Sequence, residues 1–275
     1  MDMTAAAAFR TILHACLRQY RLNEDVLLLG RQTEALHQSR VALRRLRSAF
    51  FIFKTMLPGP QARSFRDELR RLCAILGAAR DIDVLLARAP EGAVYDSLIS
   101  ARADAYAVVD DALASARTRT LMRNIVAWMS ETSWPGPSSV PKDMPATRFA
   151  TEALRRLRKR LLKRGRALKE ISDQERHDAR KSAKMLRYAS EFFMSLFPHH
   201  RQRCRYTSFI AALGALQDDM GALNDRATAI GLLEHLGIAR DKDLRSMFPV
   251  GRRKDLIADA SKAFDAVMDA KKFWR

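Results

Sequence analysis

The sequence has few of the residues that would build a redox centre, a membrane span or a β-rich fold. Cysteine occurs only three times in 275 residues, at Cys16, Cys73 and Cys204. Three cysteines so widely separated exclude a disulfide framework, and we expect them to be reduced core residues on apolar helix faces. No apolar run is long enough to cross a bilayer. The first residues carry an acid where a signal peptide would be basic, which predicts a cytoplasmic protein that does not bind a membrane.

Familiar catalytic motifs are also missing. The chain has no Walker loop, no nucleophile elbow and no regular metal-ligand spacing. Asp81, Asp83 and Asp225 could form a catalytic carboxylate set or a magnesium site. However, an aspartate after a glycine at a helix junction is a natural N-cap, and it can also hold a neighbouring arginine. We therefore expect no catalytic residue, no metal and no cofactor.

Acidic residues are too few to balance the basic ones. The chain has 49 Lys and Arg against 31 Asp and Glu, which gives a formal net charge of +18. Such a charge destabilises the folded state by self-repulsion unless a polyanion neutralises it. Nucleic acid, an anionic membrane surface and a phosphate polymer all qualify on charge alone.

The remaining pattern predicts an all-α fold. Apolar residues make up 48% of the chain and recur at helical spacing, and no run alternates β-branched with polar residues as a strand would. A third helix is predicted from about 61 to 76, with a junction beginning at Gly77. The segment Trp134–Pro145 holds four of the nine prolines and predicts a linker over about residues 134–146. The linker separates a first helical half, about 1–133, from a second, about 147–275.

A pattern of one histidine followed by cations occurs in both halves. His37, Arg40, Arg44 and Arg47 stand at i, i+3, i+7 and i+10. At about 100° per residue they lie within an arc of roughly 80° on a helix. His177, Arg180, Lys184 and Arg187 repeat the pattern, each 140 positions after its counterpart. Gly221 and Asp225 likewise follow Gly77 and Asp81 by 144 positions, which indicates a tandem duplication and a second junction at Gly221.

Two aligned stripes favour a ligand over a solvated surface. Like charges at these spacings cost a few tenths of a kcal/mol per pair on a helix, so their accumulation on one arc twice suggests an anion. Arginine suits phosphate because its planar fork donates two hydrogen bonds to adjacent oxygens. Neither His37 nor His177 has a second histidine one turn away, which argues against zinc. A further basic helix over 147–169 carries cations that surround it too widely for all to face one ligand: Arg155, Arg156, Arg158, Lys159, Arg160 and Lys163.

Four motifs together resemble the CHAD family, the conserved-histidine α-helical domain. They are HQSRVALRRLR (37–47), LGAARDIDVL (76–85), HDARKSAKMLRY (177–188) and LQDDMGALND (216–225), and the resemblance covers nearly the whole chain as a single CHAD domain. It implies two four-helix bundles related by a pseudo-twofold axis. It also implies that basic residues lining a central groove or pore hold inorganic polyphosphate. The implied polyphosphate-binding residues are His37, Arg40, Arg44, Arg45, Arg47, His177, Arg180, Lys184 and Arg187. The chain departs from the family at Met185, which stands opposite Arg45 where a basic residue is common.

The resulting hypothesis is a non-enzymatic polyphosphate-binding protein of the cytoplasm, associated with polyphosphate granules. The family is often fused to a CYTH phosphohydrolase domain, and no such segment is present in the sequence. Two alternatives stay open. A charge of +18 also suits a nucleic-acid-binding helical protein, including nonspecific binding. A phosphohydrolase could use His37 or His177 as acid, base or phosphoacceptor. The sequence does not indicate an oligomeric state.

Overall fold

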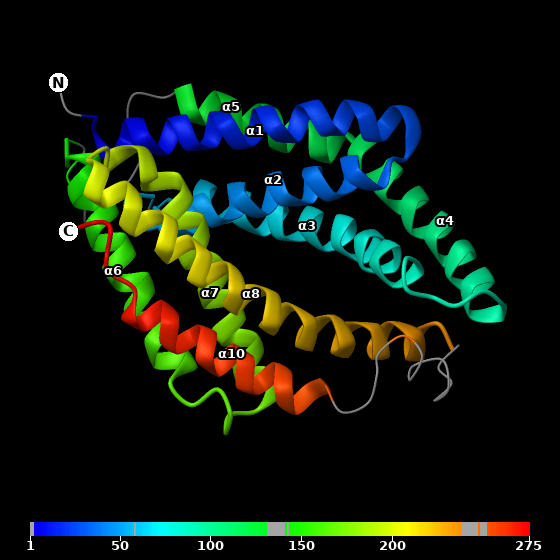
Figure 1. Cartoon of the computed structure of the whole chain (residues 1–275). Coiled ribbons are helices and arrows are strands. Elements are labelled where there is room, and N and C mark those ends of the chain that lie inside the picture. Colours follow the sequence, from blue (N-terminus) through cyan, green and yellow to red (C-terminus); the bar gives the residue numbers. More distant parts are fainter. Residues whose placement is uncertain (1–2, 58, 131–140, 142, 238–246, 248–251) are drawn as a thin grey trace. The chain divides into compact units, whose positions relative to one another are not determined.

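The computed structural model describes residues 3–57, 59–130, 141, 143–237, 247 and 252–275 (Figure 1). Within these ranges the fold is all-α, as predicted, and contains no strand; an isolated bridge pairs Thr4 with Pro145. Its helices are α1 (Ala5–Gly30), α2 (Thr33–Ile52), α3 (Pro60–Leu86), α4 (Ala93–Ala114), α5 (Ala116–Ser130), α6 (Ala146–Gly165), α7 (Asp173–Phe193), the 3-10 helix η1 (Met194–Leu196), α8 (His200–His235) and α10 (Arg252–Asp269).

The chain divides into two compact units. One comprises Ala6–Lys142 with Leu232–Met247, and we call it the α1–α5 unit. The other comprises Met1–Ala5, Asp143–Gly231 and Phe248–Arg275, and we call it the α6–α10 unit. Most of the predicted linker, 134–146, lies outside the described residues. The predicted halves at 1–133 and 147–275 and their pseudo-twofold relation stay predictions.

An aromatic cluster forms the core of the α1–α5 unit. Phe9 of α1 contacts Phe50 and Phe53, with ring centroids 5.6 and 4.8 Å apart. Trp128 of α5 stacks on Phe50 at 5.7 Å. In α1 the apolar residues recur at i, i+3, i+4, i+7, i+8 and i+11, which predicts one core-facing side, and all six are buried, which confirms it: Phe9, Ile12, Leu13, Cys16, Leu17 and Tyr20. Burying aromatic rings of this size contributes several kcal/mol to folding.

The α6–α10 unit has its own core. Leu154, Leu157 and Leu161 recur at helical spacing in α6, which predicts a core-facing side, and all three are buried where α6 packs against α7. Near the end of α6, a Cβ at Gly165 would lie 2.3 Å from Cε2 of Phe264 in α10, so only glycine permits this contact. Phe273 and Trp274 are buried, and they join Phe197, Tyr206 and Phe209 in a second aromatic cluster. The C-terminal segment is therefore anchored to α8.

Two sequence predictions are wrong. The junctions predicted at Gly77 and Gly221 lie inside α3 and α8, which continue through Asp81 and Asp225. At Gly77 the helix continues because Leu76 and Ala79 beside it are fully buried, and this packing outweighs the cost of about 1 kcal/mol for a glycine inside a helix. Cys204 is exposed, whereas Cys16 and Cys73 are buried as predicted, and all three are free thiols.

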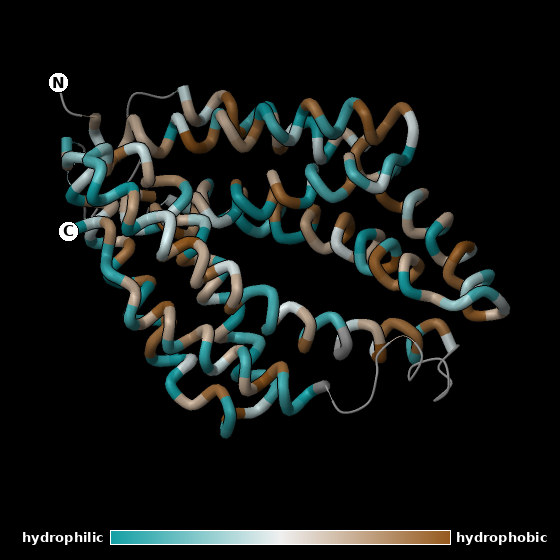
Figure 2. Tube along the Cα trace, in the orientation of Figure 1, coloured by the Kyte–Doolittle hydropathy of each residue, from teal (hydrophilic) through white to brown (hydrophobic). Residues whose placement is uncertain are grey.

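No described helix is long and apolar enough to span a membrane. Figure 2 shows why, because hydrophilic and hydrophobic residues alternate along the helices rather than forming long apolar segments. This alternation gives each helix one face for the core and another for solvent or ligand.

Candidate functional site

The first cation stripe runs along α2, on the side away from its buried residues. His37, Arg40, Arg44 and Arg47 are all half-buried. The opposite face of α2 is buried in the core through Leu36, Leu43, Leu46 and Phe50, which fixes the rotation of the helix. The cations are therefore held on a packed helix rather than on a loop.

Helix α3 positions Arg40. The Nη2 of Arg40 lies 3.5 Å from Oδ1 of Asp81 in a partly exposed ion pair. The Arg40 side chain also passes close to Gly77, one turn earlier on α3, where a Cβ would lie 3.7 Å from its Nε. Asp81 thus holds a neighbouring arginine, which is one of the two roles expected for it, and it is not an N-cap.

His37 stands at the head of this stripe in a cationic environment. Its Nδ1 atom is buried and has no hydrogen-bond partner among the described residues. Burial lowers the pKa of His37, and the nearby guanidinium of Arg80 on α3 lowers it further. Arg40 and Arg44 act in the same direction, whereas Glu34 opposes them. In the free protein this imidazole is neutral at pH 7.

Arg45 points away from the stripe. It interacts with the thiol of Cys16 in α1, although burial outweighs this contact and raises the pKa of Cys16 to about 11. Arg47, Arg44 and Arg40 instead act on Cys73 of α3, whose pKa is nevertheless raised by burial. The structure therefore brings His37, Arg40, Arg44 and Arg47 together and places Arg45 on another side of α2.

The second stripe runs along α7 and is half-buried in the same way, at His177, Arg180, Lys184 and Arg187. The helix begins with a complete capping box, in which Ser172 and Glu175 bond each other's backbone amides. His177 Nδ1 lies 2.8 Å from Oδ1 of Asn224 on α8, and the Asn224 amide donates to the Thr228 hydroxyl at 3.1 Å. At the other end, Arg187 Nε donates to Glu191 Oε1 at 3.0 Å.

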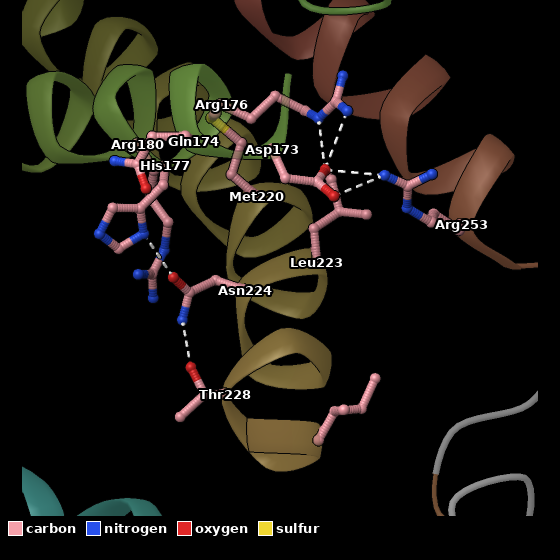
Figure 3. Close-up of a pocket in the computed structure, with 11 residues that line it drawn as sticks. Asp173, Gln174, Arg176, His177, Arg180, Met220, Leu223, Asn224, Thr228 and Arg253 are labelled. Atoms are coloured by element: carbon pink, nitrogen blue, oxygen red, sulfur yellow. Dashed lines mark hydrogen bonds and ion pairs between the residues drawn. The ribbon is translucent and has the colours of Figure 1, made fainter. Parts of the chain in front are cut away.

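A pocket of about 450 Å³ lies beside the head of the second stripe, within the α6–α10 unit (Figure 3). His177 and Arg180 line it together with Arg176 of α7 and Arg253 of α10. Its remaining lining includes Asn224, Thr228 and three apolar side chains of α8, Met220, Leu223 and Ile230.

One carboxylate joins two cations at the edge of this pocket. Both Asp173 oxygens accept from Arg253 at 2.8 Å, and Arg176 Nη2 donates to Oδ1 at 2.9 Å. The bonds from Arg176 and Arg253 hold the pKa of Asp173 below its usual value. Sequence reasoning missed Arg176 and Arg253. Arg176 could have been found as the neighbour of His177, whereas Arg253 lies about 80 residues away and only the fold brings it here.

Asp83, another of the acids considered from the sequence, is hydrogen-bonded within the core. Asp83 is buried and accepts from Arg102 Nε at 2.7 Å and from the Tyr106 hydroxyl at 2.8 Å. Burial and this bond to Asp83 raise the pKa of Tyr106 to about 12. Among the described residues no group of three or more histidines, cysteines or acids is placed to hold a metal ion.

The two stripes lie in different compact units, and each is a row of half-buried cations on a packed helix with a histidine at its head. Such a row can hold several negative charges at once. Its arginines can bond phosphate oxygens in pairs.

Comparison with known proteins agrees with this arrangement. The sequence model of the CHAD domain matches residues 11–234. The crystal structure of the CHAD domain from the plant Ricinus communis is 30% identical, with a TM-score of 0.76 over 98% of this chain and 92% of that one. PptA from Streptomyces chartreusis is 15% identical and shares the fold, with a TM-score of 0.62 over 98% of this chain and 99% of that one. No curated protein sequence matches. Because the family match spans most of the chain and includes both stripes, this protein belongs to the CHAD domain family.

Proposed function

We propose that this protein binds long-chain inorganic polyphosphate without chemically altering it, through the paired stripes of α2 and α7. Membership of a family whose members bind polyphosphate supports the ligand class. The observation that carries the proposal is the repeated row of half-buried cations, four positions on each of two packed helices. Cytoplasmic residence and association with polyphosphate granules are parts of the same proposal.

The affinity would come from many modest contacts acting together. Asp81 holds Arg40 and Glu191 holds Arg187, so these guanidinium groups are ordered before a ligand arrives. Pre-ordered cations lose little side-chain entropy on binding, and linked contacts on one polymer act as a multivalent site. Affinity should therefore increase with chain length, and orthophosphate should compete poorly.

The proposed ligand residues are His37, Arg40, Arg44, Arg47, His177, Arg180, Lys184 and Arg187. Arg45 was included in the ligand set implied by the family resemblance. Its contact with Cys16 supports a role in packing α2 against α1 instead. Arg176 and Arg253 join the set because they line the pocket beside His177.

Calorimetric titration tests the proposal directly. Long-chain polyphosphate should bind much more tightly than triphosphate, and the combined Arg40→Ala and Arg180→Ala substitutions should weaken binding at least about tenfold. Arg63→Ala with Arg123→Ala, two exposed arginines outside the stripes, provides a control of equal charge loss. Equal affinities for triphosphate and the long polymer would contradict the multivalent site.

A phosphohydrolase is the second candidate, since each stripe places a histidine beside cations that could hold a phosphoryl group. The described residues contain no metal-binding acid cluster to assist such chemistry. Phosphate release from polyphosphate with magnesium, lost on combining His37→Ala with His177→Ala, would replace the binding proposal with this one. We expect no release.

A further inference from the structure

Helix α6 carries a second basic surface that the stripes do not account for. Of its 20 residues eight are Lys or Arg and one is acidic. That acid, Glu152, pairs with Arg148 at 3.2 Å, so the other seven cations have no acid on α6 itself. The helix packs on α7 through its leucine face, and six of its eight cations are exposed.

Besides Arg148, the structure separates six of the α6 cations into two groups, whereas the exposed Arg160 lies near Arg164 and Asp178. Arg158 donates to the backbone carbonyl of Met268 in α10. Arg164 donates to the Asp178 carbonyl at 3.3 Å and to the Ser182 hydroxyl at 3.2 Å. Both therefore hold α6 against its neighbours. The second group is exposed, and none of its members forms an ion pair within the described part of the chain: Arg155, Arg156, Lys159 and Lys163.

The basic character extends beyond α6 onto the C-terminal segment, where Arg275 is exposed and Lys272 is half-buried. The buried rings of Phe273 and Trp274 hold this segment in place. Lys272 lies near Arg155, and burial together with the charges of Arg275, Arg158 and Arg155 lowers its pKa. We call the six residues Arg155, Arg156, Lys159, Lys163, Lys272 and Arg275 the α6 basic surface.

The shape of this surface distinguishes between polyanions. Its cations lie on two neighbouring elements, and the four on α6 spread over an arc of roughly 100°. A single phosphate chain offers one row of charges, whereas a duplex offers two rows at a fixed spacing. Duplex nucleic acid presents phosphates on both sides of a major groove about 12 Å wide, which is close to the diameter of a helix with its side chains.

The side chains also argue against single strands and against base reading. Single-stranded nucleic acid binds on exposed aromatic rings, but the aromatic residues of α6 and of the C-terminal segment, Phe149, Phe273 and Trp274, are buried. Helix α6 contains no Asn or Gln, the residues that commonly read adenine. Its Lys and Arg side chains can bond phosphate oxygens of any sequence, so most contacts from this surface would go to the phosphate backbone.

We propose that the α6 basic surface is a second polyanion site that binds the phosphate backbone of duplex nucleic acid without sequence specificity. This surface is separate from the stripe on α7, so the two polymers can be distinguished by mutation. The protein would then hold polyphosphate on its stripes and a duplex on α6.

The test compares two ligands and three variants of the full chain. Fluorescence anisotropy measures binding of a mixed-sequence 20-base-pair DNA, and calorimetry measures binding of long-chain polyphosphate. The α6 variant carries Arg155→Gln, Lys159→Gln and Lys163→Gln, which retain helix propensity. The charge-matched control carries Arg63→Gln, Arg119→Gln and Arg123→Gln, all exposed on α3 or α5. The stripe variant carries Arg40→Ala and Arg180→Ala.

The α6 variant should bind DNA at least about tenfold more weakly at 0.1 M salt, with a salt slope smaller by about 2 to 3, and should keep its polyphosphate affinity. Retained polyphosphate binding also shows that this variant is folded. Lys159→Gln alone should reduce the slope by about 1. The stripe variant should lose polyphosphate and keep DNA. Unchanged DNA binding by the α6 variant, or equal loss in the control, would overturn the proposal. Parallel loss of polyphosphate would instead assign α6 to the polyphosphate site.

Discussion

The two stripes have matching residue types, but different residues lie beside their histidines. His177 is oriented by Asn224, which is itself held by Thr228. The residue that corresponds to Asn224 in the first half is Arg80. Burial lowers the pKa of His37, and the charge of Arg80 lowers it further. The comparison teaches that two stripes with the same spacing of histidine and cations can differ in the residues that support their histidines. The first histidine is kept neutral, and the second is kept oriented.

Removing the cations of one stripe should have the largest effect on this comparison. Arg40→Ala, Arg44→Ala and Arg47→Ala together should weaken polyphosphate binding at least about a hundredfold, since each charge-assisted contact contributes about 1 to 2 kcal/mol. Arg180→Ala, Lys184→Ala and Arg187→Ala should have a similar effect. Calorimetry on both triple variants checks this. If one triple variant binds like the unmodified protein, the stripes are not equivalent and the ligand uses a single helix.

Removing the support of His177 should have a smaller effect. Asn224→Ala deletes the acceptor 2.8 Å from its Nδ1, so the ring loses its fixed orientation. We expect polyphosphate affinity to fall about fivefold. Asn124→Ala, at an exposed position of α5, is the matched control. Equal affinities for the Asn224→Ala and unmodified proteins would show that orientation of this ring does not matter.

The charge state of His37 should make binding depend on pH. The groups around it are Glu34, Arg40 and Arg44 on α2 and Arg80 on α3, and its lowered pKa leaves it neutral in the free protein. A bound polyanion favours the imidazolium, so binding takes up a proton and affinity should increase severalfold from pH 7.5 to 5.5 at constant salt. Most of this increase should disappear in His37→Gln and remain in His177→Gln. A pH dependence that persists in His37→Gln would assign it to another group.

The same lowered pKa predicts a small effect on stability. The unfolded chain binds a proton near pH 6.5, whereas folded His37 binds it only at lower pH, so the free energy of unfolding should decrease as the pH falls below about 6.5. Arg80→Asn gives the first histidine a neighbour like that of the second. An NMR titration should then show the pKa of His37 moving upward, and urea unfolding should show less loss of stability at acid pH. A pKa that does not move would mean that burial alone sets it.

Much of the fold and the stripes could be predicted because both depend on local periodicity. The apolar spacing of α1 and α6 identified buried faces, and the repeated spacing of cations identified α2 and α7. The interruption predicted at Gly77 failed because a glycine costs a helix only about 1 kcal/mol, which the burial of Leu76 and Ala79 beside it outweighs. Arg253 could not be found because its ion pair with Asp173 joins residues that only tertiary packing brings together.

The direction of Arg45 was predictable in principle. Arg45 comes eight residues after His37, which places it about 80° from His37 around the helix axis. The other three arginines lie on the opposite side of His37, so helical geometry alone separates Arg45 from the stripe. Its contact with Cys16 shows what it does there. Exposure of Cys204 also has a sequence signal, because arginines precede and follow it directly.

The capping box of α7 has a consequence for the dynamics of the two stripes. Ser172 and Glu175 bond backbone amides at the start of that helix. Glu175 is only two residues before His177. Helix α2 begins after Gln32, whose side chain makes no such bond. An uncapped first turn frays more readily, so amide protons around residues 33–36 should exchange with solvent faster than those around 173–176. Under the proposed function, polyphosphate would bind α7 as a helix whose first turn is already formed. On α2, part of the binding free energy would instead be used to order the first turn.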